Sequence, residues 1–174
     1  FIRIMTYDIG IIGGGIVGAA TFYQLQTRYP KLKIVLIEKE DELAAHQTGH
    51  NSGVLHSGLY YKPGSLKAEN CREGLIEIVE FSKKYGIAHD VCGKVIAAAS
   101  EDELPRMDKI YQIGLENEMP GLRKLTRDEV KEIEPSVEAI AGLLVPSTGI
   151  IDYVAATKKW LRLPWPKIPI RNWF

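Results

Sequence analysis

The feature that most constrains the fold is a glycine-rich turn near the N-terminus, between an apolar run and an amphipathic segment. Tyr7 to Ile12 ("YDIGII") has the continuous apolar character of a buried parallel strand. The following "GGGIVGAATFYQLQTRYP" predicts a helix that ends before Pro30, with an apolar face formed by Ile16, Ala19, Ala20 and Tyr23. Residues 34–37 ("IVLI") predict a second strand. This order predicts a parallel β-α-β unit.

The glycines of the turn follow the spacing G-x-G-x-x-G, with a further glycine in the first gap. Gly13 permits a tight turn, Gly15 permits close approach of a pyrophosphate, and Gly18 permits close packing of helix on strand. The N-terminus of the helix offers amides and a positive dipole end to an anion. Glu38 ends the second strand, where a carboxylate can hold a ribose and repel a 2′-phosphate. We therefore predict a dinucleotide site, NAD or FAD rather than NADP, that includes Gly13, Gly14, Gly15, Gly18, Glu38 and Lys39.

The composition excludes several other classes of protein. The chain has 174 residues, and its 22 Lys and Arg equal its 22 Asp and Glu, so no net charge attracts nucleic acid or an anionic membrane. Cys71 and Cys92 stand in no metal or disulfide pattern, and we expect no metal site. No apolar run reaches the roughly 18 residues of a membrane span, and the opening residues lack the plan of a signal peptide. We expect a cytoplasmic protein, with peripheral association at the inner membrane as the other possibility.

The middle of the chain carries further secondary-structure signals. Ser65 predicts the start of a helix that runs to about Lys84, with an apolar face of Cys71, Leu75, Ile78 and Val79. Residues 94–99 predict a strand, and residues 101–117 predict another helix. Thr126 opens "TRDE", a capping-box pattern that predicts a short helix. "AGLLVP" then predicts a short strand before the chain turns away in "STGIIDY".

The last segment, "KKWLRLPWPKIPIRNWF", differs from everything before it. It holds all three tryptophans and three of the nine prolines. Prolines exclude a regular helix and a central strand. We interpret residues 155–174 as a non-native or truncated end. The alternative is a membrane-surface anchor with interfacial tryptophans.

Three stretches together resemble a known family: "YDIGIIGGGIVGAATFYQL", "LIEKE" and "HQTGHNSGVLHSGLYYKPGSLKA". They are similar to the N-terminal part of FAD-dependent oxidoreductases of the D-amino-acid oxidase superfamily. Within it, the long third stretch is most similar to the L-2-hydroxyglutarate oxidase/dehydrogenase family. The likeness continues more weakly through "CGK", "EIEP" and "VPSTGIIDY" and stops near Val154.

The resemblance implies a fold and a division of the chain. The implied fold class is α/β, a Rossmann-like FAD-binding βαβ domain with the start of a mixed-sheet substrate domain, truncated. Residues 5–90 would form the N-terminal part of the FAD-binding domain, and residues 91–154 the start of the substrate domain and its connections. The chain would be an N-terminal fragment, because no second glycine-rich flavin motif occurs in it.

The resemblance also implies roles for the histidine-bearing stretch. The cofactor FAD would be wrapped by Thr48, Gly49, His50, Asn51, Ser52 and Gly53. His56 would lie near the reactive ring as a base for the substrate hydroxyl, a role that suits a histidine near neutral pH, and Tyr60 would supply a phenol at the same place. Covalent attachment of the flavin through His50 stays open. We expect His46 to be an ordinary loop residue.

The implied reaction is oxidation of L-2-hydroxyglutarate to 2-oxoglutarate by hydride transfer to flavin N5. Oxygen or a membrane quinone would accept the electrons, and the isolated fragment would be inactive. Two alternatives stay open. One is a related flavoenzyme that acts on an amine, an amino acid or glycerol 3-phosphate. The other is a non-catalytic nucleotide-binding remnant.

Overall fold

The computed structural model describes residues 6–165 and 170–172, and it divides the chain into two compact units. The first unit comprises Phe1–Gly53 with Asp152–Phe174, and the second comprises Val54–Ile151. These units are defined by compactness. The domain boundaries predicted above concern cofactor and substrate binding, and they stay predictions.

The first unit contains the predicted β-α-β element. Strand β1 (Ile9–Ile12) is followed by helix α1 (Ile16–Arg28) and strand β2 (Ile34–Glu38). The two strands are parallel neighbours, with Ile9 opposite Ile34. β2 is the middle strand of a three-stranded sheet and is almost wholly buried along its first three residues, as expected of a strand with neighbours on both sides. The predicted α/β class is therefore confirmed.

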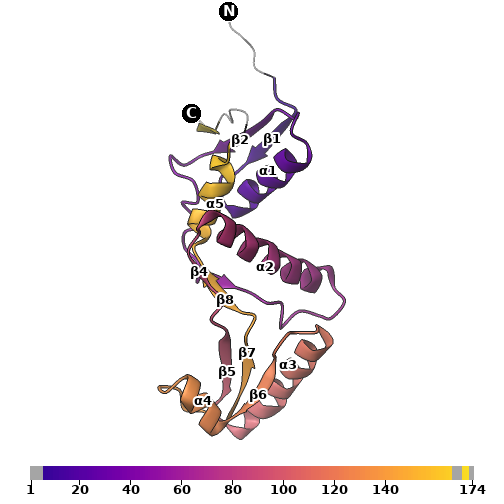
Figure 1. Cartoon of the computed structure of the whole chain (residues 1–174), viewed down its shortest axis with the longest axis vertical. Helices are drawn as coiled ribbons and strands as arrows, with labels where there is room; N and C mark the ends of the chain where they lie inside the picture. Colours follow the sequence, from indigo (N-terminus) through magenta and orange to yellow (C-terminus); the bar gives the residue numbers. More distant parts are fainter. Residues whose placement is uncertain (1–5, 166–169, 173–174) are drawn as a thin grey trace, which may run out of the picture. The chain divides into compact units, whose positions relative to one another are not determined.

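A second helix of the first unit comes from the far end of the chain. Helix α5 (Tyr153–Arg162) lies against α1 (Figure 1), and Trp160 stacks on Tyr23 with 6.0 Å between ring centroids. The prediction that prolines exclude a regular helix from residue 158 onward was wrong, because the first proline of the segment is Pro164, after α5 has ended. Strand β9 (Ile170–Asn172) pairs in parallel with β2 at the edge of the sheet.

The buried face of α1 differs from the predicted one. Ala19 and Phe22 have no exposed surface, and Gln26 is 3% exposed. The Gln26 side chain donates a hydrogen bond to the Pro30 carbonyl, which satisfies a polar group inside the core. Of the predicted face, Ala19 is buried, whereas three members are only half-buried: Ile16, Ala20 and Tyr23. The buried stripe of α1 therefore runs through Ala19, Phe22 and Gln26, and Tyr23, which stacks on Trp160 of α5, lies beside it.

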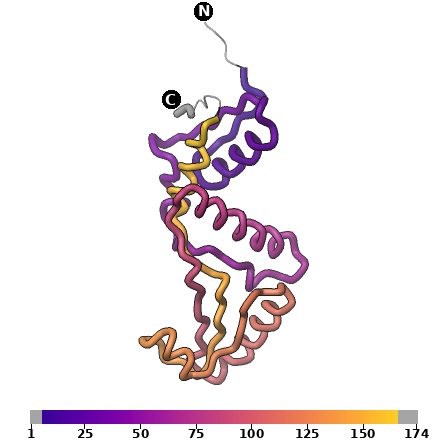
Figure 2. The backbone as a smooth tube through the Cα atoms, in the orientation of Figure 1, coloured from indigo at the N-terminus to yellow at the C-terminus, as the bar shows by residue number. Residues whose placement is uncertain are grey.

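The second unit holds an antiparallel sheet of three strands in the order β5-β7-β6. These are β5 (Lys94–Ala98), β7 (Ala141–Val145) and β6 (Arg123–Thr126). β5 and β7 lie side by side although about forty residues separate them in the sequence (Figure 2). Both strands occur where the sequence predicted them.

Two helices cover this sheet. Helix α3 (Leu104–Glu116) follows a short 3-10 turn, η1 (Glu101–Glu103), and helix α4 (Arg127–Ile133) follows β6. The capping box of α4 is present as predicted: the Thr126 hydroxyl accepts from the Glu129 amide and the Glu129 carboxylate accepts from the Thr126 amide.

Neighbouring residues of β7 show which face each helix covers. Leu143 packs with Met107 of α3, and Leu144 packs with Val130 of α4. Successive side chains of a strand point to opposite faces, so α3 and α4 cover opposite faces of the sheet. The core of the second unit therefore lies on both sides of β7.

The second unit also contains three short strands and one long helix. Strand β3 (Val54–Leu55) and strand β4 (His89–Asp90) both pair antiparallel with β8 (Gly149–Ile151). Helix α2 (Leu66–Tyr85) is capped as predicted, because the Ser65 hydroxyl accepts from the Ala68 amide. Its predicted apolar face is half-buried, and its buried positions are Ala68, Phe81 and Ser82. Within the described residues, none of the helices combines the length and apolar character required to cross a bilayer.

Candidate functional site

The glycine turn joins β1 to α1 through close contacts that exclude side chains. Gly13 has φ +102°, which favours glycine, and its amide donates to the Ile37 carbonyl at the end of β2. A Cβ on Gly18 would lie 1.9 Å from the Gly13 carbonyl oxygen. Glycine at both positions is therefore required by the backbone path itself.

The N-terminus of α1 is capped from a distant part of the chain. Gly15, the N-cap residue, has no side chain to offer. The Thr48 hydroxyl instead accepts from the Ile16 amide at 2.9 Å, and Thr48 is only 8% exposed. The first four amides of a helix have no partner within it. Thr48 satisfies one of them, and the others lie in the first turn, where an anionic group can be bound.

Glu38 is held by three backbone amides. Its Oε2 accepts from Gly14 at 2.5 Å, and its Oε1 accepts from Lys39 at 2.7 Å and from Glu40 at 3.0 Å. Partial burial, the largest single influence, raises the pKa of Glu38, but the three amides and the nearby His46 together outweigh it and leave the pKa below its ordinary value. A carboxylate has about four acceptor positions. One therefore remains for a ligand hydroxyl.

The loop from residue 44 to residue 53 folds back onto the glycine turn. The Ala44 amide donates to the Gly14 carbonyl at 3.2 Å. The Asn51 side chain donates to the carbonyls of Gln47 and Thr48, and its oxygen accepts from the Gly53 amide. These bonds fix the loop internally, so Asn51 organises the backbone that carries Thr48.

These parts enclose a cleft of about 410 Å³ within the first unit. Pockets for small ligands start at about 300 Å³. Of the predicted cofactor residues, the cleft is lined by Gly13, Gly15, Glu38, Lys39 and Thr48. Gly14 and Gly18 do not line it: Gly14 donates its amide to Glu38, and Gly18 lies in the first turn of α1. The glycine turn, the helix N-terminus and a strand-end carboxylate at one cleft fit the adenosine diphosphate half of a dinucleotide.

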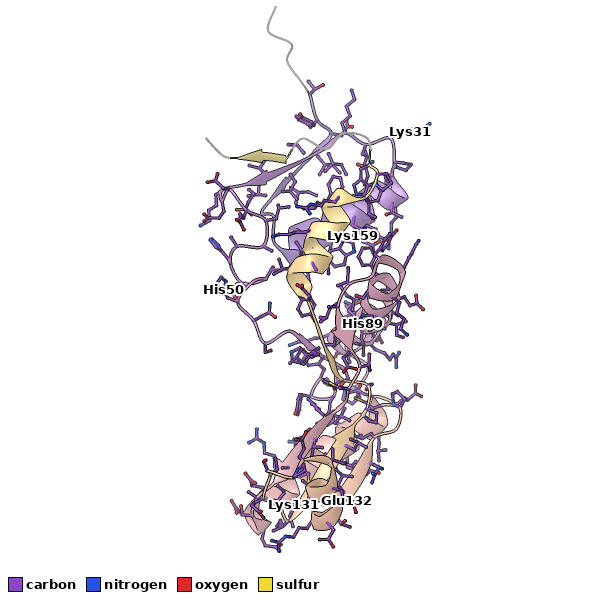
Figure 3. The ribbon with its side chains drawn as sticks, turned by 60° about the vertical axis from the view of Figure 1, so that its left-hand side comes forward. Lys31, His50, His89, Lys131, Glu132 and Lys159 are labelled. Carbon is purple, nitrogen blue, oxygen red and sulfur yellow. The ribbon has the colours of Figure 1, made fainter. Side chains whose placement is uncertain are left out.

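The rest of the predicted loop does not line this cleft, namely Gly49, His50, Asn51, Ser52 and Gly53. His50 projects from the loop between β2 and β3 (Figure 3), and its Nδ1 lies 2.9 Å from the His46 carbonyl. A carbonyl only accepts hydrogen bonds, so Nδ1 carries the proton and Nε2 is the nitrogen left for other contacts. Cofactor binding by these five residues stays a prediction.

Sequence reasoning missed several residues that line the cleft. They are Ile12, Ile37, Glu40, Ala44, Ala45, His46 and Gln47. His46, expected to be an ordinary loop residue, lies with its Nε2 2.9 Å from a Glu40 carboxylate oxygen, and Lys39 lies 3.3 Å from the same oxygen. Ala44 has φ +64°, a conformation that favours glycine. No local pattern indicated that this alanine would turn the chain over the cleft.

The two predicted catalytic residues belong to the second unit. His56 follows β3 and is exposed. Tyr60 is 52% exposed, and the Lys94 ammonium lies 3.5 Å from its hydroxyl. Among residues 6–165 and 170–172, no cluster of three His, Cys, Asp or Glu side chains suited to a metal ion is found. The catalytic roles of His56 and Tyr60 stay predictions.

Residues 8–163 match the family model of FAD-dependent oxidoreductases called DAO. The chain therefore belongs to the FAD-dependent oxidoreductase family, whose cofactor is FAD. This membership confirms the family resemblance and agrees with the cleft, which fits the half of FAD that contains adenosine.

Known proteins resemble the chain over most of its length. It is 47% identical over 156 residues to the L-2-hydroxyglutarate dehydrogenase of Indibacter alkaliphilus, covering 90% of this chain and 39% of that protein. It is 47% identical over 148 residues to the human mitochondrial L-2-hydroxyglutarate dehydrogenase, covering 85% of this chain and 32% of that protein. Among solved structures, the FAD-bound L-alpha-glycerophosphate oxidase of Mycoplasma pneumoniae aligns with a TM-score of 0.79 at 30% identity, over 90% of this chain and 42% of that one. The chain thus spans less than half the length of these relatives.

Proposed function

We propose that the protein that contains this chain oxidises L-2-hydroxyglutarate to 2-oxoglutarate with FAD as its cofactor. The observation that carries the proposal is the 47% identity to an L-2-hydroxyglutarate dehydrogenase over 90% of the chain. The cleft of the first unit supports the cofactor part of the proposal independently, because its glycine turn and its carboxylate suit a dinucleotide.

The predicted cofactor residues have separate tasks in this proposal. The turn from Gly13 to Gly15 and the first amides of α1 hold the diphosphate, and Glu38 accepts hydrogen bonds from the adenosine ribose. The residues from Thr48 to Gly53 continue along the cofactor. When bound, FAD supplies the acceptor, at N5, for the hydride that leaves C2 of the substrate. The protein contributes orientation and a dry, fixed site.

His56 is the proposed base that takes the proton of the C2 hydroxyl, and Tyr60 is the proposed hydroxyl group beside it. These two roles are supported by the exposure of both side chains to solvent. Among the residues that the structure describes, no hydrogen-bond partner of the His56 ring is found, so both ring nitrogens are open to a substrate. A base must reach the proton it removes within hydrogen-bond distance. Replacing His56 with Gln tests the role, with a fall of about 100-fold or more in kcat expected.

The decisive experiment is a substrate screen with a redox dye on the longest natural protein that contains this sequence. Reduction of the dye with L-2-hydroxyglutarate, and not with its D enantiomer, supports the proposal. Turnover of L-alpha-glycerophosphate or of an amino acid instead would favour the related activity, which the likeness to L-alpha-glycerophosphate oxidase makes the second candidate. Flavin binding without turnover of any of these compounds would leave a non-catalytic nucleotide-binding protein.

The same proposal covers the electron acceptor, the location and the isolated chain. Oxygen or a quinone accepts the electrons, and an oxygen electrode in the presence or absence of a quinone analogue distinguishes them. We propose a cytoplasmic location with peripheral binding at the inner membrane, which cell fractionation tests. The 174-residue chain alone is proposed to be inactive, because it spans 39% of the length of its relative.

A further inference from the structure

Lys94 and Tyr60 form a contact in the second unit that the sequence gives no reason to expect. Lys94 is the first residue of β5, and Tyr60 lies in the turn after β3. The Lys94 ammonium lies 3.5 Å from the Tyr60 hydroxyl and 4.7 Å from the centre of its ring. Tyr60 is 52% exposed and Lys94 is half-buried, so a ligand in solution can reach both groups.

Within the described part of the chain, the Lys94 ammonium has no carboxylate partner. Several other lysines and arginines form ion pairs with carboxylates, among them Lys39, Arg72, Arg123, Lys124, Arg127 and Lys131. Among the residues that the structure describes, no carboxylate lies within 4.0 Å of Lys94. An ammonium has three donors, and the long contact with the phenol occupies one of them at most. Two donors are therefore available to an anion.

Hydrogen bonds to Thr148 connect the segment that carries Lys94 with the segment that carries His56. Thr148 is only 2% exposed, and its hydroxyl lies 3.2 Å from the hydroxyl of Ser57, the residue after His56. The Thr148 carbonyl accepts from the amide of Gly93, the residue before Lys94, at 2.7 Å. One buried threonine thus ties together the two backbone segments that carry the proposed base and the unpaired cation. The contact between Lys94 and Tyr60 is a second tie between them.

We propose that Lys94 binds a carboxylate of the hydroxy acid substrate and that the Tyr60 hydroxyl donates a second hydrogen bond to the same group. The inference rests on the proposed function and names the part of that site which recognises the anion. A hydroxy dicarboxylate carries two negative charges near neutral pH, so its site needs cations. Charge-assisted hydrogen bonds from an ammonium to a carboxylate are about twice as strong as neutral ones, so Lys94 both orients the acid and selects for its charge.

The test compares three variants of the longest natural protein that contains this sequence, purified with its flavin. Lys94→Met removes the charge and keeps a chain of similar length, whereas Lys94→Arg keeps the charge. Lys67→Met is the matched control, because Lys67 lies 4.3 Å over the ring of Tyr61 in a similar pair. The first measurement is the Kd of 2-oxoglutarate, followed by the change in flavin absorbance. The second is the KM of L-2-hydroxyglutarate.

Lys94→Met is expected to raise both constants by about 10-fold or more, the effect of losing a hydrogen bond to a charged group. kcat should change less than KM, Lys94→Arg should recover most of the affinity, and Lys67→Met should match the wild type. The flavin content and the Tm of each variant establish that it is folded. Wild-type Kd and KM values in a folded Lys94→Met protein would overturn the inference and leave the proposed function intact. A wild-type protein that neither binds 2-oxoglutarate nor oxidises L-2-hydroxyglutarate would overturn the proposed function itself.

Discussion

The Thr48 hydroxyl accepts the Ile16 amide at 2.9 Å, so a residue 32 positions away in the sequence caps the helix that the glycine turn begins. Gly15 occupies the N-cap position, and glycine has no side chain with which to cap. The same absence of a side chain lets a ligand approach the turn. The fold therefore keeps the turn open at Gly15 and stabilises the helix from the loop that carries Thr48.

Replacement of Thr48 with Val should lower the free energy of unfolding by about 1 kcal/mol, the usual effect of removing a helix cap. Valine has nearly the same shape and lacks the hydroxyl. Urea denaturation at neutral pH measures the change. Thr48→Ser, which keeps the hydroxyl, should lose less, and equal losses in both variants would contradict a capping role.

Replacement of Gly18 with Ala should destabilise the protein by about 2 kcal/mol or more, because the new Cβ would meet the Gly13 carbonyl oxygen at 1.9 Å and the backbone must move. Gly74 in α2 gives the matched control, since a Cβ there meets nothing within 4 Å. Gly74→Ala should stabilise the chain by about 0.5–1 kcal/mol, the gain from replacing glycine within a helix. Thermal unfolding of both variants measures the difference. Equal Tm values for the two variants would contradict the steric role of Gly18.

The stabilising contribution of the Glu38 carboxylate should be lost in acid. Its pKa in the native state is lowered from an ordinary value of 4.5, so its contribution is complete above that pH and is lost as the pH falls through the lowered native value. Glu38→Gln removes this titration while keeping a similar shape. Between about pH 6 and about pH 3.5, the variant should therefore lose less stability than the wild type.

Urea denaturation at a series of pH values measures how the free energy of unfolding changes with pH in the wild type and in Glu38→Gln. Glu129 and Glu138 also have lowered pKa values, each chiefly through hydrogen bonds, but they are present in both proteins and cancel in the comparison. Parallel slopes for wild type and variant would mean that the amides around Glu38 do not favour its charged form.

Replacement of Asn51 with Ala should loosen the loop that carries Thr48. The side chain of Asn51 makes hydrogen bonds with the backbone of Gln47, Thr48 and Gly53, and alanine makes none of them. We expect faster limited proteolysis within residues 46–53 and an affinity for ADP that is weaker by about 10-fold, as the loop must be ordered on binding. Fluorescence titration measures the affinity. An unchanged cleavage rate would show that the loop is held by other contacts.

The sequence predicted the elements whose causes are local. The glycine spacing predicted the turn and the parallel β-α-β unit, and Ser65 and Thr126 marked the starts of two helices. A cap or a tight turn involves residues within about four positions of one another, so its pattern is visible in the chain itself. The glycine and carboxylate positions lining the cleft were predictable from the regular spacing of a dinucleotide-binding β-α-β unit, although Glu38 meets Gly14 across 24 positions.

Only the tertiary structure placed the residues that act across long separations. Helix α5, more than a hundred residues later in the sequence, packs against α1 and stacks Trp160 on Tyr23. The buried positions of α1 include Phe22 and Gln26, which the sequence did not predict. Ala44 to Gln47 line the cleft because the loop folds over the glycine turn, and no spacing rule links those positions.

The contact between Tyr60 and Lys94 has the same origin, since Thr148 ties two segments that lie far apart in the sequence. Local sequence thus determined which groups can bind a dinucleotide. Chain packing decided which distant side chains complete the site, because such contacts depend on the path of the whole backbone rather than on neighbouring residues.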